Sequence, residues 1–189
     1  MDFSGEFNKI NSIYNNEGVI HEASLNFISR KFFTEFKHRT NVERRAEVAF
    51  AVERKSGKII VIRTEFYPRD IYRIPTGGIN FGEDILSALD REIAEELGVK
   101  TEIKRFLGAV KYNITYKNER LNFYSFVFWL KELSGNILKD AIENEIFEFI
   151  EVDHDELLKI CDNLKNNTSS WKDWCSFRLQ TTQFILEYL

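Results

Sequence analysis

One segment, residues 77–99, constrains this chain more than any other part of its sequence. It reads GGINFGEDILSALDREIAEELGV and carries acidic residues between glycines near its two ends. Four apolar residues recur in it at intervals of three or four positions, which is the spacing of one helix face: Leu86, Leu89, Ile93 and Leu97. The segment therefore predicts a helix from Asp84 to Leu97 that packs on a core and is closed by Gly98.

Three glutamates, Glu92, Glu95 and Glu96, fall together on the neighbouring face of this predicted helix. Like charges at such spacings repel by about 0.2–0.5 kcal/mol per pair, and the carboxyl-terminal half of a helix disfavours anions. A hard divalent cation removes the conflict, because Mg²⁺ is bound through carboxylates and substrate phosphates. Glycines just upstream let the backbone approach such an ion, so the Gly77 carbonyl is a further candidate ligand. A solvated acidic face is the alternative.

The complete spacing of this segment resembles the Nudix box: Gly, five residues, Glu, seven residues, then Arg-Glu-aliphatic-x-Glu-Glu-x-Gly-aliphatic. Every defined position matches, with Gly77, Glu83, Arg91, Glu92, Ile93, Glu95, Glu96, Gly98 and Val99. The resemblance implies an α/β fold of the Nudix type, in which a mixed sheet lies between helices in an α/β/α sandwich. It also implies Mg²⁺- or Mn²⁺-dependent hydrolysis of a pyrophosphate bond in a nucleoside diphosphate linked to another moiety. Such substrates include nucleotides, nucleotide sugars and dinucleoside polyphosphates.

The resemblance also assigns roles to residues of the box. It implies that Glu92, Glu95 and Glu96 are metal ligands, and that Glu95 or Glu96 deprotonates the attacking water. It implies that Arg91 holds Glu83 in an ion pair that supports the geometry of the loop and helix. Those two residues are therefore expected to be structural rather than chemical.

Some members of the family take the catalytic base from a later loop. The stretch AIENEIFEF offers Glu143 and Glu145 just before a predicted strand. Both are candidates for the base, and solvated loop acids are the alternative.

Candidates for substrate binding lie outside the box. An arginine can bind a terminal phosphate bidentately, and Arg63 and Arg73 are placed for this just before the box, although surface arginines are often only solvated. Tyr72 stands where relatives often carry an aromatic residue, so it either stacks on a base or packs. Tyr116 lies 17 residues after Val99, where a tyrosine is associated with diadenosine polyphosphate hydrolases.

The rest of the chain predicts strands around this helix. Residues 47–67 read as two strands joined by a Ser-Gly turn, residues 106–116 and 121–133 as a long hairpin, and residues 146–152 as another strand. Asp153 is a candidate cap for a helix over 155–164, and residues 174–189 predict a closing helix. Strands interrupted by one helix and followed by others indicate a mixed α/β sandwich.

Residues 1–40 predict two helices rather than strands. Phe3, Phe7 and Ile10 recur at helical spacing before Gly18, and Leu25, Ile28, Phe32 and Phe36 form a second apolar stripe. These observations predict a helical N-terminal extension, residues 1–40, ahead of a Nudix domain over residues 41–189 that includes the C-terminal helix. The apolar stripes must be covered by the main domain or by a second subunit, so a homodimer is one expectation.

Composition narrows the remaining classes. The net charge of −4 argues against a broad nucleic-acid-binding surface. No apolar stretch approaches the roughly 20 residues that span a bilayer, and the N-terminus lacks the pattern of a signal peptide. Cys161 and Cys175 have no neighbouring ligands for zinc and are expected to be free thiols. We therefore expect a cytoplasmic protein that binds a small nucleotide-like substrate, without nucleic-acid or membrane partners.

Two other functions fit parts of the sequence. A Nudix-fold sensor would bind a nucleotide without hydrolysing it, but such a protein has no need to keep every metal ligand of the box. A structural role would leave the acidic helix merely exposed, and failure to bind Mn²⁺ would indicate it.

Overall fold

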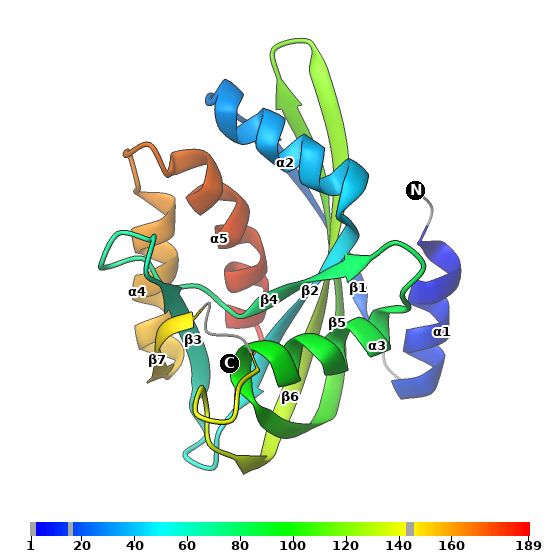
Figure 1. The fold of residues 1–189 in the computed structure, drawn as a ribbon, viewed down its shortest axis with the longest axis vertical. Coiled ribbons are helices and arrows are strands. Elements are labelled where there is room, and N and C mark those ends of the chain that lie inside the picture. The colour runs from blue at the N-terminus through cyan, green and yellow to red at the C-terminus, as the bar shows by residue number, and fades with distance from the viewer. Residues whose placement is uncertain (1–2, 15–16, 143–145) are drawn as a thin grey trace.

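A mixed seven-stranded sheet forms the middle layer of the computed structural model, which describes residues 3–14, 17–142 and 146–189 (Figure 1). Its strands are β1 (Val19–Asn26), β2 (Arg44–Glu53), β3 (Ile59–Thr64), β4 (Thr76–Asn80), β5 (Val99–Tyr116), β6 (Glu119–Gly135) and β7 (Ile146–Val152). The order across the sheet is β1-β5-β6-β2-β3-β7, and β4 pairs with β2 beside this path. The β1–β5 and β2–β6 pairs are parallel and the others are antiparallel.

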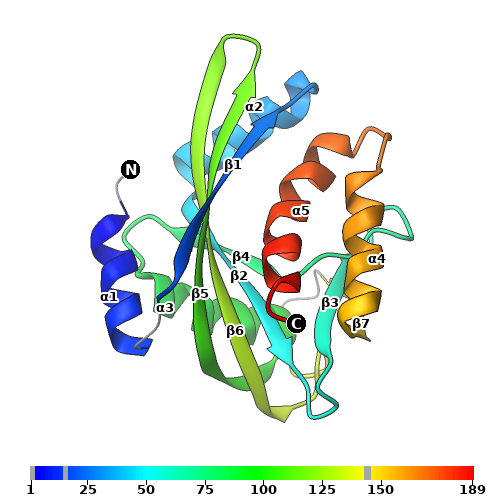
Figure 2. The same cartoon turned by 180° about the vertical axis from the view of Figure 1, so that it is seen from behind.

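Helices cover both faces of this sheet. They are α1 (Ser4–Tyr14), α2 (Arg30–Val42), α3 (Ile85–Glu92), the π-helical turn η1 (Ile93–Leu97), α4 (His154–Lys165) and α5 (Lys172–Leu186). In Figures 1 and 2, α1 and α3 lie on one side of the sheet, and α4 and α5 lie on the other. The predicted α/β/α sandwich is confirmed.

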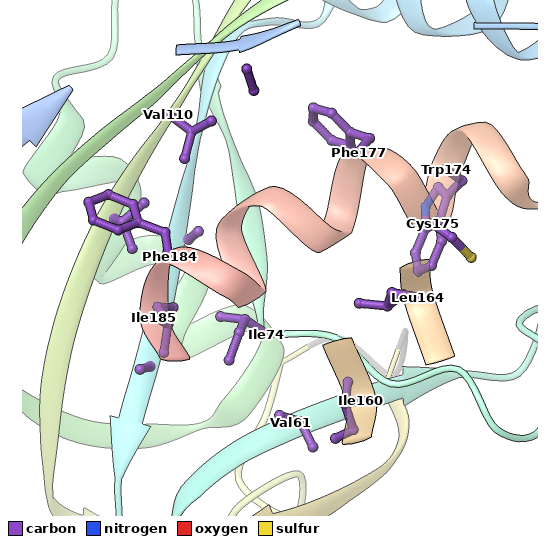
Figure 3. Close-up of a cluster of buried hydrophobic side chains, with 14 of the residues drawn as sticks. Val61, Ile74, Val110, Ile160, Leu164, Trp174, Cys175, Phe177, Phe184 and Ile185 are labelled. Atoms are coloured by element: carbon purple, nitrogen blue, oxygen red, sulfur yellow. The ribbon is translucent and has the colours of Figure 1, made fainter. Parts of the chain in front are cut away.

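The two faces of the sheet hold two separate apolar cores. Alternate residues of β2 serve them in turn, since Val48 and Phe50 belong to the core beneath α1 and α3, whereas Ala49 and Ala51 belong to the core beneath α2, α4 and α5. Figure 3 shows the second core, where Phe177, Phe184 and Ile185 of α5 point toward the sheet. This alternation matters for the site, because one strand presents side chains to both layers.

The N-terminal region differs from the two predicted helices. Residues 19–26 form β1, which pairs in parallel with β5 along its whole length, so the expected helical stripe that began at Leu25 was wrong at its start. The helix α2 begins only at Arg30, where the Ser29 side chain accepts a hydrogen bond from the Phe32 backbone N–H at 3.2 Å.

The chain's own sheet covers part of the apolar residues of this region, whereas Ile13 and Ile28 are exposed. Phe7 and Ile10 of α1 are buried in one core and Phe33 of α2 in the other. This is one of the two expected arrangements. The homodimer and the boundary at residue 40 remain predictions.

The other predicted elements are present. The hairpin of β5 and β6 extends beyond the predicted ranges at both ends. Asp153 caps α4 in a capping box with Glu156. Cys161 and Cys175 are buried free thiols, and burial raises the pKa of each to about 11. Among the described helices, none has the length and apolar character needed to cross a lipid bilayer.

Candidate active site

The loop between β4 and α3 sets the start of the acidic helix. Asp84 caps α3, and its carboxylate accepts hydrogen bonds from the backbone N–H groups of Leu86 at 3.1 Å and Ser87 at 3.2 Å. The neighbouring Glu83 carboxylate accepts from the Asn80 N–H at 2.9 Å. These bonds fix both the end of the strand and the first turn of the helix.

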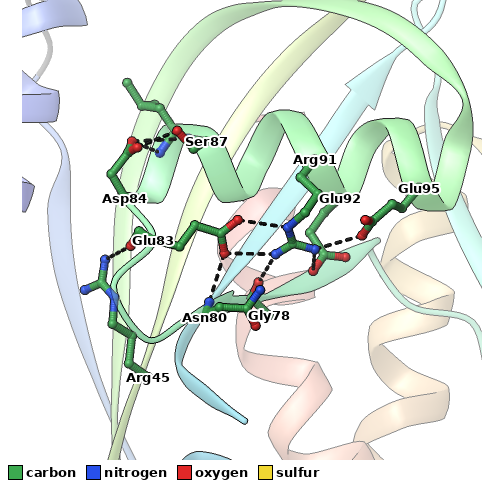
Figure 4. Close-up of polar contacts among 10 residues, drawn as sticks. Arg45, Gly78, Asn80, Glu83, Asp84, Ser87, Arg91, Glu92 and Glu95 are labelled. Carbon is green, nitrogen blue, oxygen red and sulfur yellow. Dashed lines mark hydrogen bonds and ion pairs between the residues drawn. The ribbon is translucent and has the colours of Figure 1, made fainter.

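Arg91 is the centre of the polar network in Figure 4. It donates to both oxygens of Glu83, from Nε at 2.8 Å and from Nη2 at 3.0 Å, and to the Gly78 carbonyl oxygen at 2.8 Å. Its Nη1 atom donates to Glu92 Oε1 and to Glu95 Oε2, each at 2.8 Å. One guanidinium therefore ties the loop to two of the three box glutamates that the sequence predicts as ligands.

This network shifts the protonation of its members. Hydrogen bonds from Arg91 hold the pKa of Glu83 below its ordinary value. Burial raises the pKa of Glu92, and the hydrogen bond from Arg91 only partly opposes that effect. A carboxylate whose charge is disfavoured by burial gains most from a cation placed beside it.

Glu92 lies directly against Gly77. A Cβ atom at Gly77 would lie 2.0 Å from Glu92 Cδ and 2.2 Å from its Oε2, so only glycine leaves room for this carboxylate. The Glu92 carboxylate therefore lies against the backbone of β4. Carboxylates and a backbone carbonyl, the donor types found here, fit a hard divalent cation such as Mg²⁺ or Mn²⁺.

The helix changes its pitch where the second and third glutamates lie. The Gly98 N–H donates to the Ile93 carbonyl at 3.0 Å, five residues back, and Gly98 itself has φ of 67°. This wider turn rotates Glu96 relative to Glu92, compared with a continuous α-helix. Glu96 is buried and interacts electrostatically with Arg73.

The three glutamates do not yet converge. Among residues 3–14, 17–142 and 146–189, no group of three or more His, Cys, Asp or Glu side chains is placed to hold a metal ion. The contacts above give the reason, because Glu92 and Glu95 turn toward Arg91 whereas Glu96 lies near Arg73. Binding of a cation by all three requires side-chain rotation.

The residues predicted to bind substrate lie in different surroundings. Arg73 is buried and donates to the Ile74 carbonyl and to Thr76 Oγ1, each at 3.0 Å. Arg63 donates from Nε to Glu148 Oε1 at 2.9 Å, and the Tyr72 hydroxyl donates to the same oxygen. Arg63 and Tyr72 thus share one partner on β7.

The remaining predicted residues lie elsewhere or are not described. Tyr116 stacks on Phe33 at a centroid distance of 5.5 Å, toward the tip of the β5–β6 hairpin. Glu143 and Glu145 lie outside the described residues, so their candidacy as the base stays a prediction.

A cavity of about 820 Å³ lies on the other face of β2, between α2, α5 and the loop after β3. Its size is within the range of about 300–1,000 Å³ that is usual for small-molecule sites. Aromatic side chains from five separate segments line it, among them Phe32, Phe36, Tyr67, Trp171, Trp174 and Phe177.

A buried ion pair lies at the edge of this cavity. Arg178 Nη1 donates to both oxygens of Glu47 at 3.0 Å, and the Ser125 hydroxyl donates to Glu47 at 2.6 Å. Burial acts to raise the pKa of Tyr67, but the charges of Arg73 and Arg178 outweigh it and the pKa is lowered. Because Arg73 interacts with both Glu47 and Glu96, it connects the cavity to the acidic helix.

The sequence did not predict that Arg44, Glu47 and Arg178 line one cavity. The basic run around Arg44 looks solvated in the sequence, and Arg178 lies within an apparently structural helix. A charged residue inside the apolar β2 stretch, as Glu47 is, was the one available signal, because a carboxylate is rarely buried without a partner.

Comparisons with known proteins give matches both in sequence and in fold. A family model described as the NUDIX domain matches residues 43–175. The chain is similar to an ADP-ribose pyrophosphatase of Methanocaldococcus jannaschii, with 30% identity over 113 residues that cover 56% of this chain and 66% of that protein. It is also similar to an RNA pyrophosphohydrolase of Haemophilus ducreyi, with 36% identity over 73 residues that cover 39% of this chain and 36% of that protein.

Solved structures show the same fold. A NUDIX hydrolase from Nitrosomonas europaea superposes with a TM-score of 0.53 and 17% identity, covering 76% of this chain and 88% of that one. The chain spans less than two thirds of the length of the two curated relatives above.

Proposed function

Because this chain belongs to the Nudix family, we propose that it hydrolyses a pyrophosphate bond in a nucleoside diphosphate linked to another moiety, with Mg²⁺ or Mn²⁺ as cofactor. The observation that carries the proposal is the set of box carboxylates on α3 and η1: Arg91 holds Glu92 and Glu95 beside Gly77, and the buried Glu96 interacts with Arg73, which also interacts with Glu47 at the cavity.

Glu92, Glu95, Glu96 and the Gly77 carbonyl would hold the cation. A divalent ion bound there supplies charge neutralisation on the diphosphate oxygens and lowers the pKa of a bound water. The raised pKa of Glu92 favours this binding, because the ion compensates a carboxylate whose charge burial disfavours.

The protein's own groups would orient and deprotonate the water. Glu95 or Glu96 accepts the proton as the water oxygen attacks phosphorus, and the phosphate on the other side of the broken P–O bond leaves. Arg91 and Glu83 act as positioning residues, since their ion pair ties the β4–α3 loop to the helix that carries the glutamates. A general base of this kind contributes about 10²–10⁴-fold to the rate.

The test is product release across a panel of substrates with Mg²⁺ or Mn²⁺. The panel holds nucleoside triphosphates, ADP-ribose, nucleotide sugars, dinucleoside polyphosphates, NADH and RNA with a 5′-triphosphate. We expect turnover of at least one class, lost by about 10²-fold or more in the variant that removes the base.

The variants are Glu95→Gln and Glu96→Gln, and Glu102→Gln on the exposed part of β5 is the matched control. Binding of Mn²⁺, followed by electron paramagnetic resonance, gives a readout that does not depend on turnover. Absence of turnover together with metal-dependent binding of one panel member would favour the catalytically silent nucleotide sensor instead.

A further inference from the structure

The N-terminal helix α1 lies outside the matched family region but packs beside the start of the acidic helix. The family match begins at residue 43, whereas α1 spans Ser4–Tyr14. Figures 1 and 2 both show α1 next to α3 on the same side of the sheet. Phe7 and Ile10 bury one face of α1 in the core that α3 also covers. Polar residues of α1 are therefore close to the loop between β4 and α3.

Arg45 connects α1 to this loop. It donates to the two carboxylate oxygens of Glu6, from Nη1 at 2.7 Å and from Nη2 at 2.8 Å. Its Nη2 atom also donates to the Glu83 carbonyl oxygen at 2.5 Å, a bond that Figure 4 shows. The guanidinium carbon lies 5.1 Å from the centre of the Phe3 ring. One largely buried cation thus joins two residues of α1 to the loop.

A β-bulge explains why Arg45 points toward α1. In the β2–β4 ladder, Arg44 pairs with Asn80 and Ala46 pairs with Ile79, so Arg45 is an extra residue in β2. Residues two apart in a regular strand lie on the same face. Here Arg44 lines the cavity on one face, whereas Ala46 belongs to the core beneath α1 on the other. The bulge therefore places Arg45 on the side of α1.

The Glu83 carbonyl belongs to the peptide from which α3 starts. The next residue, Asp84, caps that helix. The Glu83 carboxylate is held by Arg91 at 2.8 and 3.0 Å. Arg45 thus fixes the backbone of Glu83 while Arg91 fixes its side chain. Together the two arginines set the orientation of the loop relative to the helix that carries the box glutamates.

We propose that α1 is part of the support of the active site, with Glu6 and Arg45 as positioning residues. Glu6 holds the guanidinium, and Arg45 holds the peptide between Glu83 and Asp84. The assignment rests on the proposed hydrolase function and adds to its site a segment that precedes the matched region. Both residues act through Glu83. Removal of a group that orients metal ligands in this way costs about 10–100-fold in metal affinity or activity.

Binding of Mn²⁺ to the Arg45→Gln variant separates position from charge. Removal of a cation beside an acidic site would, by charge alone, strengthen the binding of Mn²⁺. Loss of the loop position weakens it instead. We expect the Mn²⁺ affinity, measured by electron paramagnetic resonance, to fall about tenfold or more. Arg45→Lys keeps the charge and one possible donor to the Glu83 carbonyl, so it should recover part of the affinity.

A double-mutant cycle tests the role of Glu6. Glu6→Gln should weaken Mn²⁺ binding in the wild-type background, because the guanidinium loses its charged partner. In the Arg45→Gln background the same substitution should have almost no further effect, since Glu6 acts through Arg45. Additive losses would overturn the connection from α1 through Arg45.

Arg54→Gln is the matched control. Arg54 follows the other end of β2 and forms ion pairs with Glu132 and Glu151. The control therefore removes an arginine that holds carboxylates, as Arg45→Gln does, but at the end of the strand away from β4. Arg54→Gln should lower stability in urea and leave the Mn²⁺ affinity unchanged.

Hydrogen exchange in EDTA gives a readout that needs neither metal nor turnover. The amides of Leu86 and Ser87 donate to the Asp84 cap. In Arg45→Gln they should exchange faster, while the amides of α4 keep their wild-type rates. Arg54→Gln should leave the amides of Leu86 and Ser87 unchanged.

The two proposals fail in different ways. Equal Mn²⁺ affinity of wild type and Arg45→Gln, or an equal loss in Arg54→Gln, would overturn the positioning role and leave the hydrolase standing. Faster exchange of the cap amides with unchanged Mn²⁺ affinity would also overturn it, because the bonds would then only stabilise the loop. Loss of Mn²⁺ affinity in Arg45→Gln, without turnover of any panel substrate by the wild type, would remove the hydrolase and leave the support of the metal site by α1.

Discussion

A Cβ atom at Gly77 would lie 2.0 Å from Glu92 Cδ and 2.1 Å from its Cγ. We therefore expect Gly77→Ala to displace Glu92, to destabilise the protein by about 1–3 kcal/mol through overpacking, and to weaken Mn²⁺ binding. Urea unfolding in EDTA measures the loss of stability, and electron paramagnetic resonance of Mn²⁺ measures the loss of metal binding.

A double-mutant cycle separates this clash from a backbone effect. Glu92→Ala removes the side chain that the new methyl group meets, so the cost of Gly77→Ala should fall in that background. An equal cost in both backgrounds would show that Gly77 acts through its backbone and not through the room it leaves for Glu92.

The ion pair between Arg91 and Glu83 gives stability a defined pH dependence. The pKa of Glu83 is held below its ordinary 4.5 by Arg91, so its stabilisation is fully present above about pH 4.5 and is lost as the pH falls through the lowered pKa. Glu83→Gln should cost about 1–3 kcal/mol at neutral pH, and the difference from wild type should shrink in acid. Urea unfolding of metal-free protein between pH 7 and 3 measures it, and a difference that stays constant over this range would contradict the assignment.

At the scale of elements, the acidic helix was only partly predictable. The stripe from Leu86 to Leu97 and the closing Gly98 gave its limits, because apolar spacing and a left-handed terminus are local signals. The π-helical turn over Ile93–Leu97 left no such signal, since one more residue in a turn does not change which residue types suit a helix. The strand β1 was missed for a related reason. It lies at the edge of the sheet and only Ala23 is buried along it, so its sequence shows no alternation of apolar and polar residues.

The end of this helix depends on Gly98 in two ways. Its φ of +67° is strained for other residues, and a Cβ atom there would lie 2.2 Å from backbone atoms of Asp140 and Ala141. Gly82 has φ of +83° with nothing within 4 Å of its Cβ position, which makes it a control for backbone strain alone.

We expect Gly82→Ala to cost about 1 kcal/mol, whereas Gly98→Ala should cost about 3 kcal/mol or more because a backbone clash adds to the strain. Thermal and urea unfolding give both values. Equal costs would show that the contact with residues 140–141 relaxes freely and does not fix the end of η1.

At the scale of the whole molecule, the sandwich was predictable but the cavity was not. The box residues lie within one short segment, so their spacing alone places them on neighbouring turns, although no three acidic side chains of the described residues are placed to hold one ion. The cavity gathers Phe36, Arg44, Tyr67 and Arg178 from elements far apart in sequence, and only the order of strands and the faces of the helices place them side by side. Glu47 shows the same limit, because its partner Arg178 lies 131 residues away.

The pairing of β1 with β5 begins at one very close backbone contact. A Cβ atom at Gly108 would lie 1.9 Å from the Val19 carbonyl oxygen, and Gly108 has φ of +133°. Val19 pairs with Gly108 at the start of the β1–β5 ladder. Because backbone cannot move aside as a side-chain end can, Gly108→Ala should separate β1 from β5 there and loosen the N-terminal elements that cover the sheet.

Hydrogen exchange resolved by residue tests this, since local opening is read separately from global unfolding. In Gly108→Ala, amides of β1 should exchange faster by a larger factor than those of the central β2–β6 ladder. Gly5→Ala in α1, where nothing lies within 4 Å of the new Cβ, is the control and should not change β1. An equal acceleration at every amide would mean that the β1–β5 pairing opens only when the whole fold unfolds. The first 40 residues and the matched domain would then unfold as one cooperative unit.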